Sequence, residues 1–91
     1  MIRRTMEVSN RLGLHARAAA KLVRLASRFE SEVHLAREGA DQRIDSKSIL
    51  GVLMLAASRG TRLVVSVEGE DEAEAERAIR RLFESGFGEE A

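Results

Sequence analysis

Alternation of apolar and polar residues, in segments too short for long helices, is the pattern that most restricts this chain of 91 residues. It is clearest over residues 62–67, where Leu, Val and Val face one way. Similar alternation predicts strands over 2–8, with Arg4 as its one exception, and over 32–35. Residues 42–45 could form a further short strand. The chain must therefore build a small sheet with one apolar face.

Apolar residues at helical spacing separate these strands. The spacing predicts helices over residues 16–28 and 71–85, each with one core-facing stripe. Residues 46–57 form a third helical segment that is apolar over much of its circumference. Acidic residues at the start of the last helix and basic ones near its end suit the helix dipole, and Gly86 is a plausible cap.

The expected order of elements is β-α-β-β-α-β-α. Strands with one apolar face, interspersed with helices, favour an α+β fold in which helices cover one side of an antiparallel sheet. The length allows a single domain, residues 1–91, with a modest core. No linker or internal repeat divides it.

The charge balance narrows the possible partners. Fifteen basic residues offset fifteen acidic ones, which argues against a nucleic-acid or membrane-surface binder. Three Phe and no Trp or Tyr make a base-stacking surface unexpected. The absence of Cys fits a reducing compartment, and no signal peptide or membrane-spanning stretch is found. We therefore expect a soluble cytoplasmic protein.

The run Gly13-Leu14-His15-Ala16-Arg17 places a histidine where a turn gives way to an alanine-rich helix. The first amides of a helix lack intrahelical partners, and the helix dipole adds partial positive charge there. An anion on His15 would meet such amides, those of Ala16 and Ala18 included, with the Arg17 guanidinium close by. A lone loop histidine usually bonds nearby backbone. The turn, the helix start and the arginine together nevertheless favour a histidine that carries a phosphoryl group.

No metal or cofactor is expected. His34 falls on the polar face of its strand, has no matching ligand nearby, and is interpreted as a surface residue. Two isolated histidines make a poor metal site, and a chain without Cys offers no thiolate ligand. The chemistry predicted for His15 requires neither.

Two further features lie at the third helical segment. Asp45-Ser46-Lys47-Ser48 contains preferred N-cap residues, so capping is the simpler role, while the functional alternative is phosphorylation of Ser48. Four apolar residues exceed what one buried face requires, and any that are exposed would form a docking patch for a partner protein. These residues are Ile49, Leu50, Leu53 and Met54.

Together, Gly13-Leu14-His15-Ala16-Arg17 and Lys47-Ser48-Ile49-Leu50-Gly51-Val52 resemble the HPr family of phosphocarriers, part of the bacterial phosphoenolpyruvate-dependent phosphotransferase system. The resemblance covers residues 2–88 and keeps the predicted order of elements. It implies an open-faced β-sandwich, with a four-stranded antiparallel sheet covered by three helices. It also implies a co-substrate in a relay, a phosphocarrier with a phosphohistidine intermediate, and not an enzyme with its own turnover.

The resemblance implies roles for the matching residues. The histidine matching His15 takes phosphate at Nδ1 from phospho-enzyme I and gives it to an enzyme IIA, and the arginine matching Arg17 assists. The serine matching Ser48 is, in some bacteria, the target of an HPr kinase. Such a carrier is expected to act as a monomer. Apolar family positions that contact enzyme I and other partners match Ile49, Leu50 and Leu53.

Two departures from the usual family pattern resemble the NPr branch, which is tied to nitrogen and regulatory phosphotransfer. Ala18 stands where the family usually has proline, and the segment between Leu35 and Ser48 is two residues longer. The ending over residues 82–87 is also similar to NPr. The implied recipient is then a regulatory enzyme IIA. A sugar-transport HPr is the alternative within the family.

Two alternatives come from other functional classes. An acylphosphatase-like phosphohydrolase has a similar size and a similar alternation of strands and helices, and Asn10-Arg11 could supply its Asn and Arg. The Gly-rich cradle that such an enzyme needs for phosphate is missing. A pure interaction module acting through residues 49–54 would bind partners independently of His15.

Overall fold

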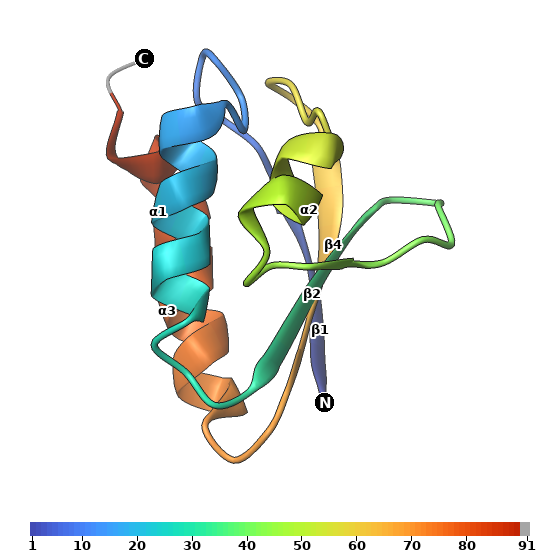
Figure 1. Ribbon diagram of the computed structural model, residues 1–91, viewed down its shortest axis with the longest axis vertical. Coiled ribbons are helices and arrows are strands. Elements are labelled where there is room, and N and C mark those ends of the chain that lie inside the picture. Colours follow the sequence, from blue (N-terminus) through green and yellow to red (C-terminus); the bar gives the residue numbers. More distant parts are fainter. Residues whose placement is uncertain (90–91) are drawn as a thin grey trace.

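The computed structural model describes residues 1–89, which form one sheet with helices on one of its faces (Figure 1). The order of elements confirms the predicted α+β class, β-α-β-β-α-β-α. The strands are β1 (Ile2–Glu7), β2 (Glu32–Arg37), β3 (Ile44–Asp45) and β4 (Arg62–Glu68). The helices are α1 (Ala16–Ala26), α2 (Ile49–Met54) and α3 (Glu72–Glu84), followed by a 3-10 turn, η1 (Gly86–Gly88).

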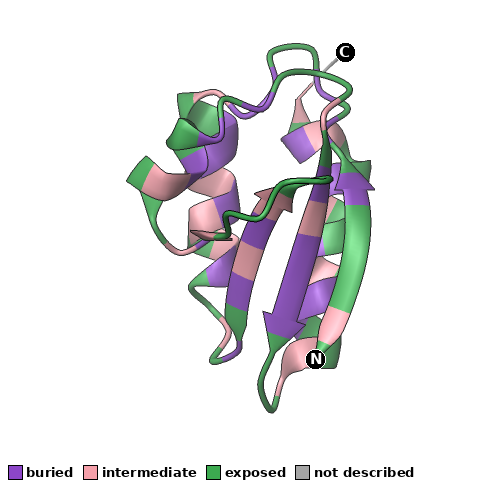
Figure 2. Cartoon of the chain, turned by 90° about the vertical axis from the view of Figure 1, so that its right-hand side faces the viewer, coloured by how far each residue is buried: buried purple, intermediate pink, exposed green. Residues whose placement is uncertain are grey.

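Strand β4 organises the sheet, whose order is β1-β4-β2-β3 with every pair antiparallel. It lies between β1 and β2, and Figure 2 shows it as a mostly buried strand in the middle of the sheet. Leu63, Val65 and Val67 are completely buried. The alternation seen in the sequence therefore marks the side of β4 that belongs to the core.

Helices α1 and α3 lie side by side over the sheet and supply the other half of the core (Figure 1). Leu22 of α1 and Ile79 of α3 are fully buried. Burial of side chains of this size contributes about 1.5–3 kcal/mol each. Within residues 1–89, no helix combines the length and the apolar character needed to span a membrane.

Arg4 interrupts the alternation of β1 because it pairs with a carboxylate of α3. Its Nε lies 3.6 Å from Oε2 of Glu76, and Nε of Arg80 lies 3.1 Å from the same oxygen. The Glu76 side chain is only 5% exposed, so its charge needs compensation by cations. The exception in the sequence pattern thus places a cation beside a buried carboxylate.

Helix α2 is shorter than the predicted segment 46–57. Ser46 is buried and its N–H donates to Val33 O at 2.9 Å, so the chain is still bound to β2 at that point. The helix begins after Ser48, whose Oγ accepts from Gly51 N–H at 3.1 Å. It ends before Ala56, which has a left-handed φ of 48°. Local capping and an αL residue therefore set both ends.

The C-terminal segment after α3 contains a structured turn that the sequence pattern did not predict. Gly86 follows the helix with φ 64°, consistent with its expected role at the helix end. In η1, Phe87 is completely buried and its ring centroid lies 4.9 Å from that of Phe83.

The remaining differences between the predicted and observed element bounds are small. Helix α1 ends at Ala26, and the strand expected over 42–45 is reduced to Ile44–Asp45.

Asp71, at the start of α3, ties this helix to the α1–β2 loop. Its carboxylate accepts hydrogen bonds from the backbone N–H groups of Glu30 and Ser31, both at 2.9 Å, and from the Ser31 hydroxyl. The Ser31 hydroxyl is the main cause that lowers the pKa of Asp71 below its ordinary value of 3.8, and the Glu30 N–H acts in the same direction.

We expect Asp71→Asn to lower the thermal unfolding midpoint at pH 7, because the lowered pKa means that folding favours the carboxylate form. This stabilisation is present above the unfolded pKa and is lost as the pH falls through the folded pKa. The difference from the parent protein should therefore shrink when thermal unfolding is followed by circular dichroism below pH 3.8. Asp41→Asn, on the exposed β2–β3 loop, is the control. A difference independent of pH would contradict the assignment.

Candidate functional site

His15 is the N-cap residue of α1. Its backbone is extended, with φ −75° and ψ −179°, and its Nδ1 accepts a hydrogen bond from Arg17 N–H at 3.3 Å. The side chain remains 26% exposed. Because Nδ1 accepts this bond, it carries a lone pair that points toward the free amides of the first helical turn.

The loop before α1 is fixed by backbone contacts to the segment after α2. Leu14 N–H donates to Ala57 O at 2.8 Å, and Gly13 has φ 71°. A Cβ on Gly13 would lie 2.5 Å from Ala57 O, so this close approach requires glycine. Asn10 adds a third constraint, because its Nδ2 donates to Gly13 O at 2.7 Å. The position of His15 is thus set by the fold around it.

The other ring nitrogen of His15 faces Glu89. Nε2 of the ring lies 2.6 Å from Oε2 of Glu89, and Oε1 of the same carboxylate accepts from Asn10 Nδ2 at 2.9 Å. A carboxylate accepts at this position, so Nε2 is the nitrogen that carries the proton in the neutral ring. The two partners together select the Nε2–H tautomer and leave Nδ1 unprotonated.

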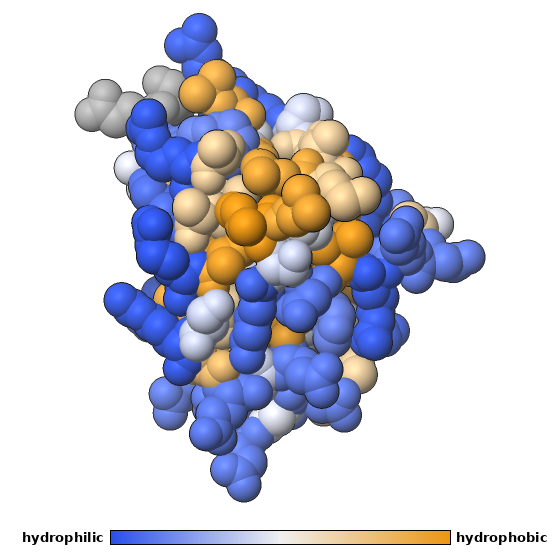
Figure 3. All heavy atoms as spheres, in the orientation of Figure 1, coloured by the Kyte–Doolittle hydropathy of each residue, from blue (hydrophilic) through white to orange (hydrophobic). Residues whose placement is uncertain are grey.

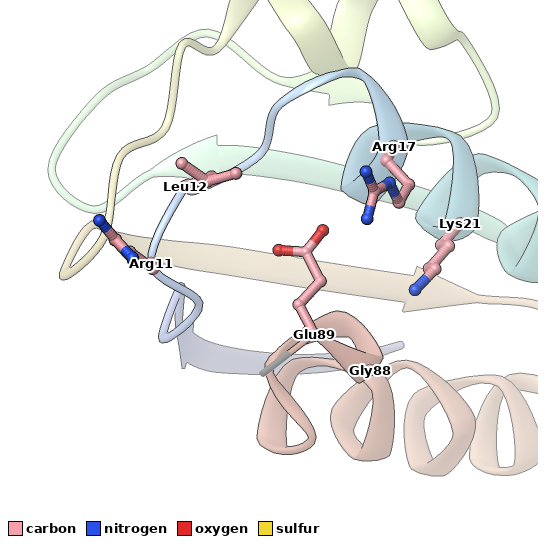
Figure 4. Close-up of a pocket in the computed structure, with 6 residues that line it drawn as sticks. All are labelled: Arg11, Leu12, Arg17, Lys21, Gly88 and Glu89. Carbon is pink, nitrogen blue, oxygen red and sulfur yellow. The ribbon is translucent and has the colours of Figure 1, made fainter. Parts of the chain in front are cut away.

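Three basic side chains surround the Glu89 carboxylate. Figure 4 shows Glu89 directed into a depression between Arg11 of the preceding loop and Arg17 and Lys21 of α1. The Asn10 amide is the main cause that lowers the pKa of Glu89 from its ordinary value of 4.5, opposed by desolvation. The hydrogen bond from His15 and the positive charge of Arg17 lower the pKa further. This side of His15 therefore suits anions.

The amides predicted to face an anion lie at the start of α1, as the sequence implied. Ala16 and Ala18 occupy the first turn, and within residues 1–89 neither N–H donates a hydrogen bond. The backbone N–H that donates to Nδ1 belongs to Arg17, for which the sequence suggested a role only for the guanidinium. At this helix start Ala16 and Arg17 are exposed, whereas Ala18 is completely buried.

Helix α2 presents both features predicted for it. Ser48 is exposed and acts as the N-cap of the helix, the simpler of the two expected roles. Figure 3 shows apolar side chains gathered over α2 and bordered by hydrophilic residues. The apolar patch consists of four exposed side chains with fractions of 43%, 67%, 37% and 70%: Ile49, Leu50, Leu53 and Met54.

The patch and His15 lie on neighbouring parts of the surface, because Ala57, just after α2, bonds to the loop that carries the histidine. Six helical residues span about 9 Å, so Ser48 lies at the opposite end of α2 from this contact. Leu12 is also 67% exposed and lines the depression beside Glu89, although the sequence did not indicate it.

His34 lies apart from this group, half-buried on β2. Residues 1–89 contain no cluster of three acidic, His or Cys side chains suited to a metal ion.

Sequence reasoning missed the residues that complete the site. The sequence offers Asn10 only as a residue of a phosphohydrolase, and it gives Lys21 no role at the site. Glu89 follows a Gly-Phe-Gly turn that no pattern indicated. The buried polar character of Asn10 is a consequence of tertiary contacts, so no local signal in the sequence could have assigned it.

Comparisons with known proteins agree with this geometry. Residues 2–85 match the family model described as "PTS HPr component phosphorylation site". The phosphocarrier protein HPr of Xylella fastidiosa (strain Temecula1) is 47% identical, covering 99% of both chains, and that of Neisseria meningitidis serogroup A is 46% identical, covering 98% of both. The crystal structure of HPr-C-His from Thermoanaerobacter tengcongensis superimposes with a TM-score of 0.93, at 42% identity and full coverage of both chains.

The fold of that structure is the open-faced arrangement of four antiparallel strands and three helices expected from the sequence. The family match spans both motifs and nearly every element of the structure. The chain belongs to the HPr family, the phosphocarriers of the phosphotransferase system that transfer a phosphoryl group through a phosphohistidine.

Proposed function

We propose that His15 is the phosphoryl carrier of this protein and that its Nδ1 is the accepting atom. Phospho-enzyme I would supply the group and an enzyme IIA would receive it. The observation that carries this proposal is the position of Nδ1 at the open start of α1, where it accepts a hydrogen bond from Arg17 N–H. A nucleophile must present a lone pair to phosphorus, and this nitrogen has one at a surface that two partners can reach in turn.

Arg17 has the electrostatic role in this proposal. A phosphoryl group on Nδ1 adds about two negative charges at the positive end of a helix. The guanidinium of Arg17 and the free amides of Ala16 and Ala18 can stabilise that charge both in the phosphorylated protein and during transfer. A cation in the first turn of a helix is unfavourable by itself, so its presence is better explained by an anion that binds there.

The apolar patch on α2 is proposed as the surface that binds both partners. Four exposed apolar side chains on a helix of six residues are more than isolated surface residues would explain. Met54 adds an adaptable side chain, which suits a surface that contacts more than one protein. Because the patch adjoins the loop of His15, a docked partner would have access to Nδ1.

Within the family, we assign the chain to the nitrogen and regulatory branch, with a regulatory enzyme IIA as recipient and a cytoplasmic monomer as the working form. Ala18 and the long segment between β2 and β3 support this choice. A sugar-transport HPr is the alternative. In that alternative, Ser48 at the far end of the patch is the proposed target of an HPr kinase, and the added charge would weaken apolar docking.

A phosphohydrolase of the acylphosphatase kind is less well supported. Such an enzyme needs an asparagine that orients water, but both described bonds of Asn10 Nδ2 are made inside the protein, to Gly13 O and Glu89. A hydrolase would consume acyl phosphates without retaining phosphate, whereas a carrier retains an acid-labile label.

Incubation with enzyme I and phosphoenolpyruvate should add one acid-labile phosphoryl group, measured by intact-protein mass spectrometry. His15→Ala should accept none, because the nucleophile is missing. Arg17→Ala should fold normally but accept the group on the order of a hundredfold more slowly, since one charge-stabilising donor is lost. His34→Ala is the control for the other histidine and should be labelled like the parent. Labelling of His15→Ala would refute the proposal.

Leu50→Glu should reduce the rate of phosphorylation by enzyme I about tenfold or more at limiting concentrations, because a charge replaces an apolar contact in the patch. The thermal midpoint should change little, since 67% of this side chain is already exposed. Ala40→Glu adds the same charge to the exposed β2–β3 loop and should transfer normally. Equal rates for both variants would place the docking surface elsewhere.

The branch assignment is tested by the choice of recipient. Phosphorylated protein is mixed separately with a regulatory enzyme IIA and with a sugar-specific enzyme IIA, and loss of label is followed over time. We expect transfer to the regulatory protein to be at least about tenfold faster, a difference of about 1.4 kcal/mol between transition states. Faster transfer to the sugar-specific protein would favour the sugar-transport alternative.

A further inference from the structure

Glu89 holds His15 through a contact that spans 74 residues of the sequence. Its Oε2 lies 2.6 Å from Nε2 of the ring, while its Oε1 is held at 2.9 Å by the Asn10 amide. The Glu89 side chain is only 11% exposed and that of His15 is 26% exposed. The carboxylate is therefore held from two sides at the nitrogen opposite to the proposed phosphoryl acceptor.

The segment that carries Glu89 is anchored well before it reaches the site. Phe87 is completely buried, and burial of such a side chain contributes about 1.5–3 kcal/mol. Its carbonyl oxygen accepts from Lys21 Nζ at 2.7 Å. Glu89 N–H donates to Gly86 O at 3.1 Å, and Ser85 Oγ accepts from Gly88 N–H at 3.2 Å. Since each of these contacts fixes the backbone, Glu89 is positioned by the fold.

We propose that Glu89 is a positioning residue for phosphoryl transfer, which keeps the proton on Nε2 of His15 in both the free and the phosphorylated protein. This inference rests on the proposed role of Nδ1. In the free protein, the Nδ1 lone pair attacks phosphorus, the N–P bond forms, and the bond from phosphorus to the donor breaks with its electron pair staying on the donor. Nε2 keeps its proton throughout, so the phosphorylated ring is a cation beside the Glu89 carboxylate.

The same proton makes the ring a good leaving group in the second transfer. A nucleophile of the next partner attacks phosphorus, the N–P bond breaks, and its electron pair returns to Nδ1. With the proton still on Nε2, the ring leaves as neutral imidazole. Without that proton it would have to leave as an anion, which is far less favourable. Stabilising the protonated ring therefore speeds release of the phosphoryl group.

The surrounding charges are consistent with an ionised Glu89. The groups that face this site are Arg11 from the loop, Arg17 and Lys21 from α1, and Glu89 itself. The pKa of Glu89 is lowered, mainly by the Asn10 amide, so the carboxylate is charged at neutral pH. The three cations would by themselves disfavour a positively charged ring, and Glu89 is the only anion among the residues that line this depression in the described chain.

The test compares Glu89→Gln with Glu84→Gln, which removes the same charge from an exposed position on α3. Both proteins are labelled with 15N in the histidine rings, phosphorylated by enzyme I and phosphoenolpyruvate, and titrated by NMR. We expect the pH at which the phosphorylated ring loses its Nε2 proton to fall by about one unit in Glu89→Gln, because an opposite charge is lost at contact distance. Glu84→Gln should titrate like the parent.

The lifetime of the phosphohistidine gives a second readout. Above the parent's midpoint, hydrolysis should be up to about tenfold slower in Glu89→Gln, because lowering the titration midpoint by about one pH unit leaves about tenfold fewer rings protonated. At low pH, where the ring of both proteins is protonated, the rates should converge. A purely structural role of Glu89 would lower the thermal midpoint without moving the titration.

The possible failures are distinguishable. If the parent protein is not phosphorylated on His15, the proposed function is wrong. If the parent is phosphorylated and the titration and hydrolysis curves of Glu89→Gln coincide with those of Glu84→Gln, only the role of Glu89 is overturned.

Discussion

The function of this chain depends on the fixed start of α1. A histidine at an N-cap must leave helical geometry while its carbonyl still accepts the first helical bond, and His15 does so with an extended backbone. The hydrogen bond from Leu14 N–H to Ala57 O and the close approach of Gly13 to the same carbonyl hold that geometry. Because this carbonyl follows α2, the loop that carries His15 is bonded directly to the end of the helix that carries the apolar patch.

The C-terminal segment supplies the second half of the site. The family motif contains the histidine and the arginine, but the ring has two nitrogens and only their different partners make them chemically distinct. Arg17 N–H at Nδ1 and Glu89 at Nε2 provide this distinction. The burial of Phe87 anchors the segment, so a core contact helps to place the Glu89 carboxylate beside the His15 ring.

The sequence predicted most of the fold because its main signals are local. The alternation over β4 and the apolar stripes of α1 and α3 follow directly from one-sided burial. The predicted fold class, the order of elements and the approximate bounds of these elements are therefore confirmed. The predicted ends of α2 were wrong, because the Ser48 cap and the αL residue Ala56 set the observed ends. Arg4 breaks the alternation of β1 for a reason that the sequence does not show, because its partner Glu76 lies on another element.

The site was predictable only where a local motif carries it. His15 and Arg17 are two residues apart at a recognisable helix start, so one stretch of sequence is enough to select them. Asn10 and Glu89 reach the ring through contacts formed only after the sheet and helices have packed. No periodicity or spacing connects residues 74 positions apart, and so the carboxylate partner of His15 could come only from the structure.

The most direct measurement is NMR of the 15N-labelled His15 ring after phosphorylation by enzyme I, with 15N–31P coupling used to identify the nitrogen bonded to phosphorus. The geometry predicts coupling to Nδ1 alone, with a proton retained on Nε2 at neutral pH. Coupling to Nε2, the nitrogen that faces Glu89, would contradict it.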